Sequence, residues 1–175
     1  TVSFTLDGEE IEAQTDETIW EIAKRHGNTI PHLCHRDKPG YRPDANCRAC
    51  MVEIEGERVL APSCRRTPTS GMKVTTNNER TKTARKMVLE LLLADQPEKV
   101  RAHDPDSLLW HWIDNARLGG SRFPVRDETP VPDTSHSAMS VNLDACIHCN
   151  LCVRACREVQ VNDVIGMAHR GAESQ

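Results

Sequence analysis

Aromatic side chains and long apolar runs are both scarce in this sequence. Three Trp, one Tyr and two Phe occur among 175 residues, and 38% of the residues are hydrophobic, which suffices for a modest core. The longest apolar stretch, residues 87–94, contains Glu90. It is much shorter than the roughly 20 residues that a membrane-spanning helix requires. We therefore expect no membrane span.

An excess of charge of one sign is also absent. The 22 Lys and Arg residues against 26 Asp and Glu give a formal net charge of −4, and both signs are spread along the chain. This excludes nucleic-acid binding through bulk charge. The first residues lack the basic start and apolar stretch of a signal peptide, so we expect a cytoplasmic protein. In that reducing compartment, eight cysteines indicate metal binding rather than disulfides.

The first 76 residues have the pattern of a small α+β domain. Apolar residues alternate on both sides of Asp7–Gly8, which predicts a β-hairpin over residues 1–14. A helix is expected next, ending at His26–Gly27, and then a long loop over residues 28–46. Further strands are expected at residues 51–55, 58–61 and 73–75. A hairpin followed by a packed helix predicts a β-grasp fold.

The middle of the chain is predicted to be a helical and proline-rich connector. Asn77 or Asn78 can cap a helix that continues to Ala94. Its expected apolar stripe consists of Ala84, Met87, Val88, Leu91 and Leu92. Its other face carries Arg80, Lys82, Arg85 and Lys86, which we expect to be solvated, with a docking patch as the alternative. A short helix is expected over residues 108–116 and an extended linker over residues 119–140.

The first four cysteines are spaced C-x12-C-x2-C-x13-C and are Cys34, Cys47, Cys50 and Cys64. A [2Fe-2S] cluster needs thiolates from two sides, which a wrapping loop and one C-x2-C pair supply. The small residues Gly40, Ala45, Ala49 and Ala61 would let backbone N–H groups approach the sulfurs. These features predict a [2Fe-2S] site.

A structural zinc site is the alternative for this first group. Zinc ribbons normally pair two C-x2-C knuckles, and only one is present here. His32 and His35 flank Cys34, but the paired Cys and His spacing of a Rieske site is absent. We therefore expect both histidines to be loop residues beside the cluster rather than ligands.

The second group, Cys146, Cys149, Cys152 and Cys156, has the spacing C-x2-C-x2-C-x3-C, which is typical of bacterial [4Fe-4S] ferredoxins. In that pattern the first three cysteines bind one cubane and the fourth binds a neighbouring one. The present sequence supplies neither the fourth ligand of the first cubane nor three more for a second. We expect the matching motif to follow residue 175, with a single cubane bound by all four cysteines as the alternative. His148, Arg154 and Arg157 lie beside this group and could offset cluster charge.

Four segments carry a resemblance to a known family, and they are Pro31–His35, Asn46–Ile54, Pro62–Arg66 and Asn142–Gln160. With them the chain resembles the N-terminal iron–sulfur region of the α subunit of NAD-dependent, molybdenum- or tungsten-containing formate dehydrogenases. Related modules occur in the large iron–sulfur subunit of complex I and in the diaphorase part of NAD-reducing hydrogenases. Complex I relatives also carry a His-x3-Cys-x2-Cys-x5-Cys motif between the two groups. No cysteine lies between Cys64 and Cys146 here, so that cluster is not expected.

The resemblance implies a relay of electrons between a formate-oxidising Mo/W bis-pterin site and a flavin subunit that reduces NAD. That site would lie in a C-terminal part of the α subunit, which would be one partner, and the flavin/NAD-binding subunits would be the other. No Gly-rich dinucleotide loop and no spare cysteine occur in residues 1–175. We therefore expect no catalytic residue in this segment. An electron-relay subunit of an NAD-linked hydrogenase or complex I relative is the alternative, and a zinc-binding structural module is a further one.

The predicted architecture is α+β in three segments. Residues 1–76 form the β-grasp [2Fe-2S] domain, residues 77–139 the connector, and residues 140–175 the first half of a ferredoxin-like [4Fe-4S] domain.

Overall fold

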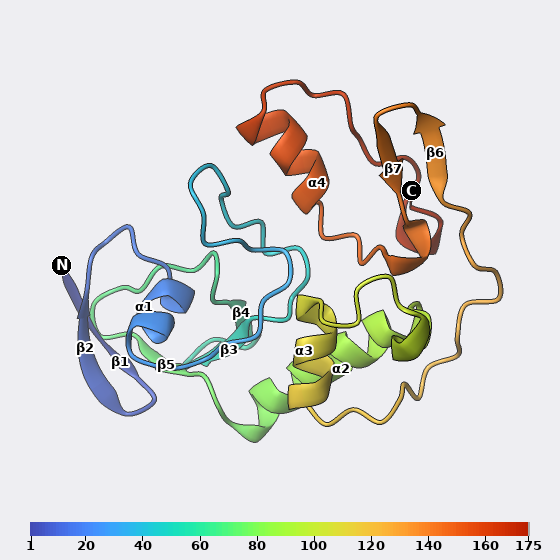
Figure 1. Cartoon of the computed structure of the whole chain (residues 1–175). Helices are drawn as coiled ribbons and strands as arrows, with labels where there is room; N and C mark the ends of the chain where they lie inside the picture. Colours follow the sequence, from blue (N-terminus) through green and yellow to red (C-terminus); the bar gives the residue numbers. More distant parts are fainter. Residues whose placement is uncertain (175) are drawn as a thin grey trace. The chain divides into compact units, whose positions relative to one another are not determined.

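A computed structural model describes residues 1–174 (Figure 1). Gln175, the last residue of the predicted third segment, lies outside the described residues. The chain divides into two compact units, residues 1–88 and the part from residue 89 onward. Within the described residues, no helix has the length and apolar character needed to cross a membrane.

The first unit is built on a five-stranded mixed sheet with the order β2-β1-β5-β3-β4. The strands are β1 (Val2–Leu6), β2 (Glu9–Ala13), β3 (Met51–Ile54), β4 (Ala61–Pro62) and β5 (Lys73–Thr75). β1 pairs with β5 in parallel, whereas every other pairing is antiparallel. The predicted hairpin over residues 1–14 is confirmed, with Phe4 opposite Ile11 in its register.

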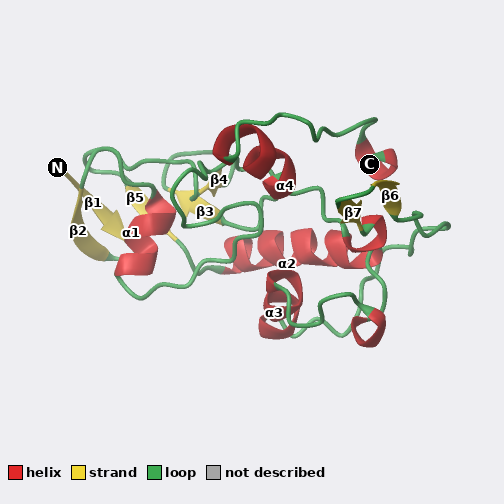
Figure 2. Ribbon diagram, turned by 45° about the horizontal axis from the view of Figure 1, so that its top comes forward, coloured by secondary structure: helices red, strands yellow, loops and turns green. Residues whose placement is uncertain are grey.

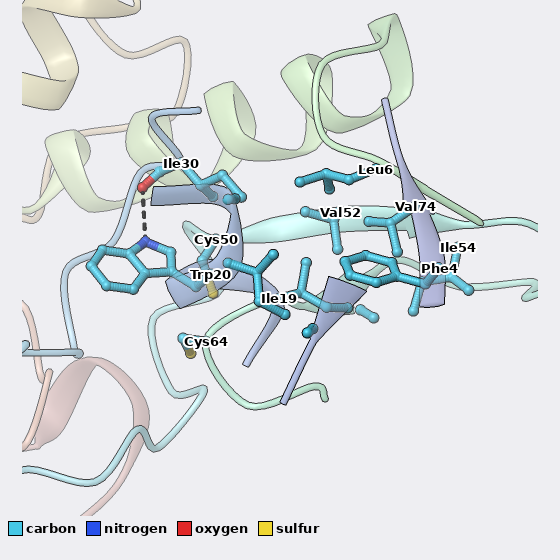
Figure 3. Close-up of a cluster of buried hydrophobic side chains, with 14 of the residues drawn as sticks. Phe4, Leu6, Ile19, Trp20, Ile30, Cys50, Val52, Ile54, Cys64 and Val74 are labelled. Carbon is cyan, nitrogen blue, oxygen red and sulfur yellow. Dashed lines mark hydrogen bonds between the residues drawn. The ribbon is translucent and has the colours of Figure 1, made fainter. Parts of the chain in front are cut away.

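Helix α1 (Ile19–Arg25) begins at a capping box. Thr18 accepts a hydrogen bond from the backbone N–H of Glu21, and the Glu21 carboxylate accepts one from the N–H of Thr18 at 2.8 Å. The helix buries four apolar residues against one face of the sheet, where they meet Phe4, Val52 and Val74 (Figure 3). These four residues are Ile19, Trp20, Ile22 and Ala23. The predicted helix is confirmed, and it closes the core over the sheet.

The predicted strand over residues 58–61 is wrong except at its last residue. Only Ala61–Pro62 pairs with β3, with Met51 opposite Pro62 and Val52 opposite Ala61. The Arg58 carbonyl oxygen accepts a 2.5 Å hydrogen bond from the Arg80 side chain instead of a strand partner. Val59 remains 60% exposed.

Helix α2 (Glu79–Ala94) is capped by Asn78, whose side chain accepts a 2.9 Å hydrogen bond from the N–H of Thr81. The predicted apolar stripe is only partly correct, because Leu91 is 49% exposed. The predicted solvated face is wrong at one residue, since Arg85 is only 9% exposed. Thr81, Arg85 and Leu89, four residues apart, form the buried line instead.

The second unit contains helix α3 (Leu108–Asn115), which confirms the short helix predicted there (Figure 2). Leu109, Trp110, Trp112 and Ile113 are its buried residues. The predicted extended linker is wrong over its last part. There β6 (Asp133–His136) and β7 (Met139–Val141) form an exposed hairpin. Asp133 accepts a hydrogen bond from the N–H of Ser135, and this local contact stabilises the hairpin without a buried face.

Candidate iron–sulfur sites

Three side chains hold the loop that carries the first cysteines. The indole of Trp20 donates a 3.1 Å hydrogen bond to the carbonyl oxygen of Ile30 (Figure 3). His32 and His35 each meet the same indole edge-on, with ring centroids 4.7 Å away. Both histidines therefore pack around Trp20, as expected for residues beside the site.

The structure brings the first four cysteines together as two pairs. Within each pair, Cys34 with Cys47 and Cys50 with Cys64, the two thiols have the largest effect on each other's pKa. Cys34 is also close enough to Cys50 and Cys64 to affect their pKa values. Cys34, Cys50 and Cys64 are at most 1% exposed, and Cys47 is half-buried.

Hydrogen bonding within each pair separates the pKa values of its two thiols. The hydrogen bond from Cys34 lowers the pKa of Cys47 to about 7, and that from Cys64 lowers the pKa of Cys50 to about 7. The same bonds, with burial, raise the pKa values of the donors Cys34 and Cys64. One thiolate per pair is thus stabilised in the metal-free protein, and a thiolate is the form that binds iron.

Backbone N–H groups point to these sulfurs, as the small residues in the loop predict. The backbone nitrogen of Cys47 donates a 3.3 Å hydrogen bond to the Cys34 sulfur, and the backbone of Ala49 lowers the pKa of Cys47. Ala45 does the same for Cys64. Ala45 and Arg48 have left-handed backbones, with φ of 57° and 58°. Such residues cost about 1 kcal/mol or more each. Left-handed residues of this kind occur in the backbone nests that bind anions.

Ser63 belongs to the site although no sequence motif singles it out. It is fully buried, its hydroxyl donates a 2.8 Å hydrogen bond to the Cys50 carbonyl oxygen, and it helps to lower the pKa of the Cys50 thiol. Its position directly before Cys64 is the only signal of this role in the sequence.

The second cysteine group is less compact. Cys146 and Cys149 are half-buried, Cys152 is exposed and Cys156 is buried. The segment continues through helix α4 (Leu151–Arg154) and a π-helical turn (Ala155–Val159) that contains Cys156. Two sulfurs accept backbone hydrogen bonds of 3.4 Å, Cys146 from His148 and Cys156 from Val164.

Neither cysteine group surrounds a single point. Over residues 1–174, no three or more His, Cys, Asp or Glu side chains are grouped so that they could hold a metal ion. In the first group this reflects the division into two pairs.

Three comparisons with known proteins agree with this geometry. Residues 1–79 match the family model of the 2Fe-2S iron-sulfur cluster binding domain. The NADP-reducing hydrogenase subunit HndD of Solidesulfovibrio fructosivorans is 34% identical over 183 aligned positions, covering 97% of this chain and 30% of the relative. The mitochondrial NADH-ubiquinone oxidoreductase 78 kDa subunit of Candida albicans is 30% identical over 178 positions, covering 99% of this chain and 24% of the relative.

A solved structure, the NAD+-reducing [NiFe]-hydrogenase in its H2-reduced state, aligns with a TM-score of 0.87 at 29% identity. The alignment covers 99% of this chain and 73% of that chain. The present chain spans less than a third of the length of the curated relatives. Residues 1–79 are thus a 2Fe-2S ferredoxin-like domain, in an α+β chain that resembles the N-terminal part of NADH-ubiquinone oxidoreductase 78 kDa subunits and NAD-reducing hydrogenase subunits.

Proposed function

We propose that this chain is the electron-transfer part of an NAD-linked oxidoreductase, with a [2Fe-2S] cluster held by Cys34, Cys47, Cys50 and Cys64. The gathering of these cysteines into two pairs, with Cys34, Cys50 and Cys64 buried, is the observation that carries the proposal. One pair can bind each iron, Cys34 with Cys47 and Cys50 with Cys64. When bound, the cluster takes up and releases single electrons.

The surrounding residues determine how easily an electron enters. The N–H groups of Cys47 and Ala49 stabilise negative charge on sulfur, and the burial of Cys34, Cys50 and Cys64 excludes water. Cys47 is the most exposed of the four ligands. We propose that electrons enter or leave beside it, because transfer rates favour the shortest path to solvent or a partner.

The second cysteine group belongs to the same proposal. Cys146, Cys149 and Cys152 would bind a [4Fe-4S] cluster, and Cys156 would bind a second one. The spacing supports this. Left-handed backbones at His148 and Asn150, with φ of 51° and 60°, fit a loop that wraps around a cluster.

For the parent complex we propose a formate dehydrogenase on the four segments of resemblance, Pro31–His35, Asn46–Ile54, Pro62–Arg66 and Asn142–Gln160. The chain would then relay electrons from a Mo/W bis-pterin site elsewhere in the α subunit to flavin/NAD-binding subunits in the cytoplasm. An NAD-linked hydrogenase is the second candidate, and the relatives support it at least as well. Assays of the native complex for NAD reduction by formate and by H2 separate the two.

The first experiment is an EPR spectrum of anaerobically purified protein, oxidised and dithionite-reduced, with iron, sulfide and zinc quantified on the same sample. A [2Fe-2S] signal that persists at higher temperature, together with a [4Fe-4S] signal seen only near liquid-helium temperature, is the expected result. An EPR-silent sample that contains zinc but no iron, and stays so after anaerobic reconstitution, would overturn the proposal.

A further inference from the structure

Arg85 is a buried cation in a position where the sequence pattern indicates solvent. It lies on helix α2 and is 9% exposed, whereas its neighbour Lys86 is exposed. Burying a guanidinium is costly unless other groups compensate for it. The burial of Arg85 therefore requires an explanation, whereas the exposed position of Lys86 does not.

The contacts of Arg85 lie next to a proposed cluster ligand. Its Nε donates a 2.9 Å hydrogen bond to the carbonyl oxygen of Met51, the residue that follows Cys50. Its Nη2 is buried and has no hydrogen-bond partner within residues 1–174. One end of the guanidinium is thus fixed against the ligand strand, while the other has an unused donor.

Negative charge close to Arg85 comes mainly from the cluster site. Burial lowers the pKa of Arg85, and the Cys50 thiolate followed by the Asp7 carboxylate counter that effect. Asp7 is already engaged, because it accepts hydrogen bonds from the N–H and the hydroxyl of Thr76, both at 2.6 Å, and from Asn28. Cys50 is therefore the principal counter-charge of Arg85.

We infer that Arg85 is a positioning residue that sets the reduction potential of the [2Fe-2S] cluster, holding a permanent positive charge beside the Cys50 ligand. The inference rests on the proposed [2Fe-2S] site. Each one-electron reduction adds one negative charge to an already anionic cluster and needs no proton. A buried cation stabilises the reduced form more than the oxidised form, because the interaction is weakly screened there. Arg85 thus raises the potential.

The test compares three variants of the full chain by EPR-monitored redox titration of the [2Fe-2S] signal. Arg85→Gln keeps a donor for the Met51 carbonyl but removes the charge, and Arg85→Lys keeps the charge. Lys86→Gln makes the same change of charge on the adjacent exposed residue. We expect the equilibrium constant for reduction to fall about tenfold in Arg85→Gln, a drop of about 59 mV. It should stay within about twofold of wild type in the other two variants.

A loaded Arg85→Gln protein with the wild-type potential, or a Lys86→Gln protein with an equal shift, would overturn the inference and leave the cluster site intact. If Arg85→Gln holds no cluster, Arg85→Lys decides. A reduction potential of Arg85→Lys near that of wild type supports the role of charge. A tenfold fall in its equilibrium constant for reduction refutes that role. Wild-type protein without a [2Fe-2S] cluster would refute the proposed function as well, so the two failures are distinguishable.

Discussion

The indole Nε1 of Trp20 donates a 3.1 Å hydrogen bond to the carbonyl oxygen of Ile30 (Figure 3). This bond joins helix α1 to the start of the cysteine loop. Replacing Trp20 with Phe keeps much of the apolar contact but removes this bond, and the carbonyl keeps only its 3.4 Å contact with Nδ1 of His32. The expected cost is about 1 kcal/mol. We expect Trp20→Phe to lower the free energy of unfolding by that amount more than a matched control, measured by urea denaturation followed by circular dichroism.

The matched control is Trp110→Phe. Trp110 is buried to a similar degree on α3, and its indole makes no hydrogen bond to another described residue. Both variants lose similar apolar area. Equal losses of stability would show that the bond to Ile30 contributes nothing measurable.

Asp7 links the first hairpin to the chain after β5. Its carboxylate accepts hydrogen bonds from Thr76 and Asn28, and its backbone is left-handed with φ of 51°. Asn tolerates this conformation and keeps one acceptor, whereas Ala does neither well. We predict that Asp7→Ala lowers the free energy of unfolding by about 2 kcal/mol and Asp7→Asn by about half as much. A thermal melt in which the two variants lose the same stability would contradict this account.

Single cysteine substitutions should remove one cluster at a time. Cys47→Ser is expected to remove or alter the [2Fe-2S] EPR signal and leave the [4Fe-4S] signal, because the two groups lie in separate units of the chain. Cys152→Ser is the reciprocal control and should affect only the [4Fe-4S] signal. An unaltered [2Fe-2S] spectrum in Cys47→Ser would refute the ligand assignment.

Removal of iron should loosen the cysteine loop. Residues 28–50 contain no helix or strand and are held by few apolar side chains of their own, so we expect the bound cluster to stabilise them. Treatment with an iron chelator should lower the melting temperature followed by circular dichroism. Hydrogen exchange should rise in this loop and stay unchanged in β1. A melt that iron chelation does not change would argue against coupling between the cluster and folding.

Local signals in the sequence were enough to predict the elements that local contacts stabilise. The Thr18 and Glu21 capping box, the Asn78 cap and the Asp7–Gly8 turn each involve residues a few positions apart. The cysteine spacings predict both candidate sites, and in the second group these residues too lie a few positions apart.

The wrong predictions concern residues whose partners lie far along the chain. The sequence pattern predicts a solvated Arg85, because its hydrogen-bond acceptor, the Met51 carbonyl oxygen, lies 34 positions away and leaves no local signal. The strand over residues 58–61 was predicted from alternation. The Arg58 carbonyl is bound by Arg80 from the following helix, which the pattern cannot reveal. The exposed hairpin of β6 and β7 has no buried face, so the sequence of β6 lacks the alternation of apolar and polar residues that would distinguish a strand from a linker.

The parallel pairing of β1 with β5 also constrains the order in which the protein is made and matures. Thr5 and Leu6 pair with Lys73 and Val74, so the N-terminal strand stays unpaired on that side until synthesis has passed residue 74. All four cysteines of the first group precede that point. They therefore leave the ribosome before the sheet can close, so their thiols are accessible while the domain is still open.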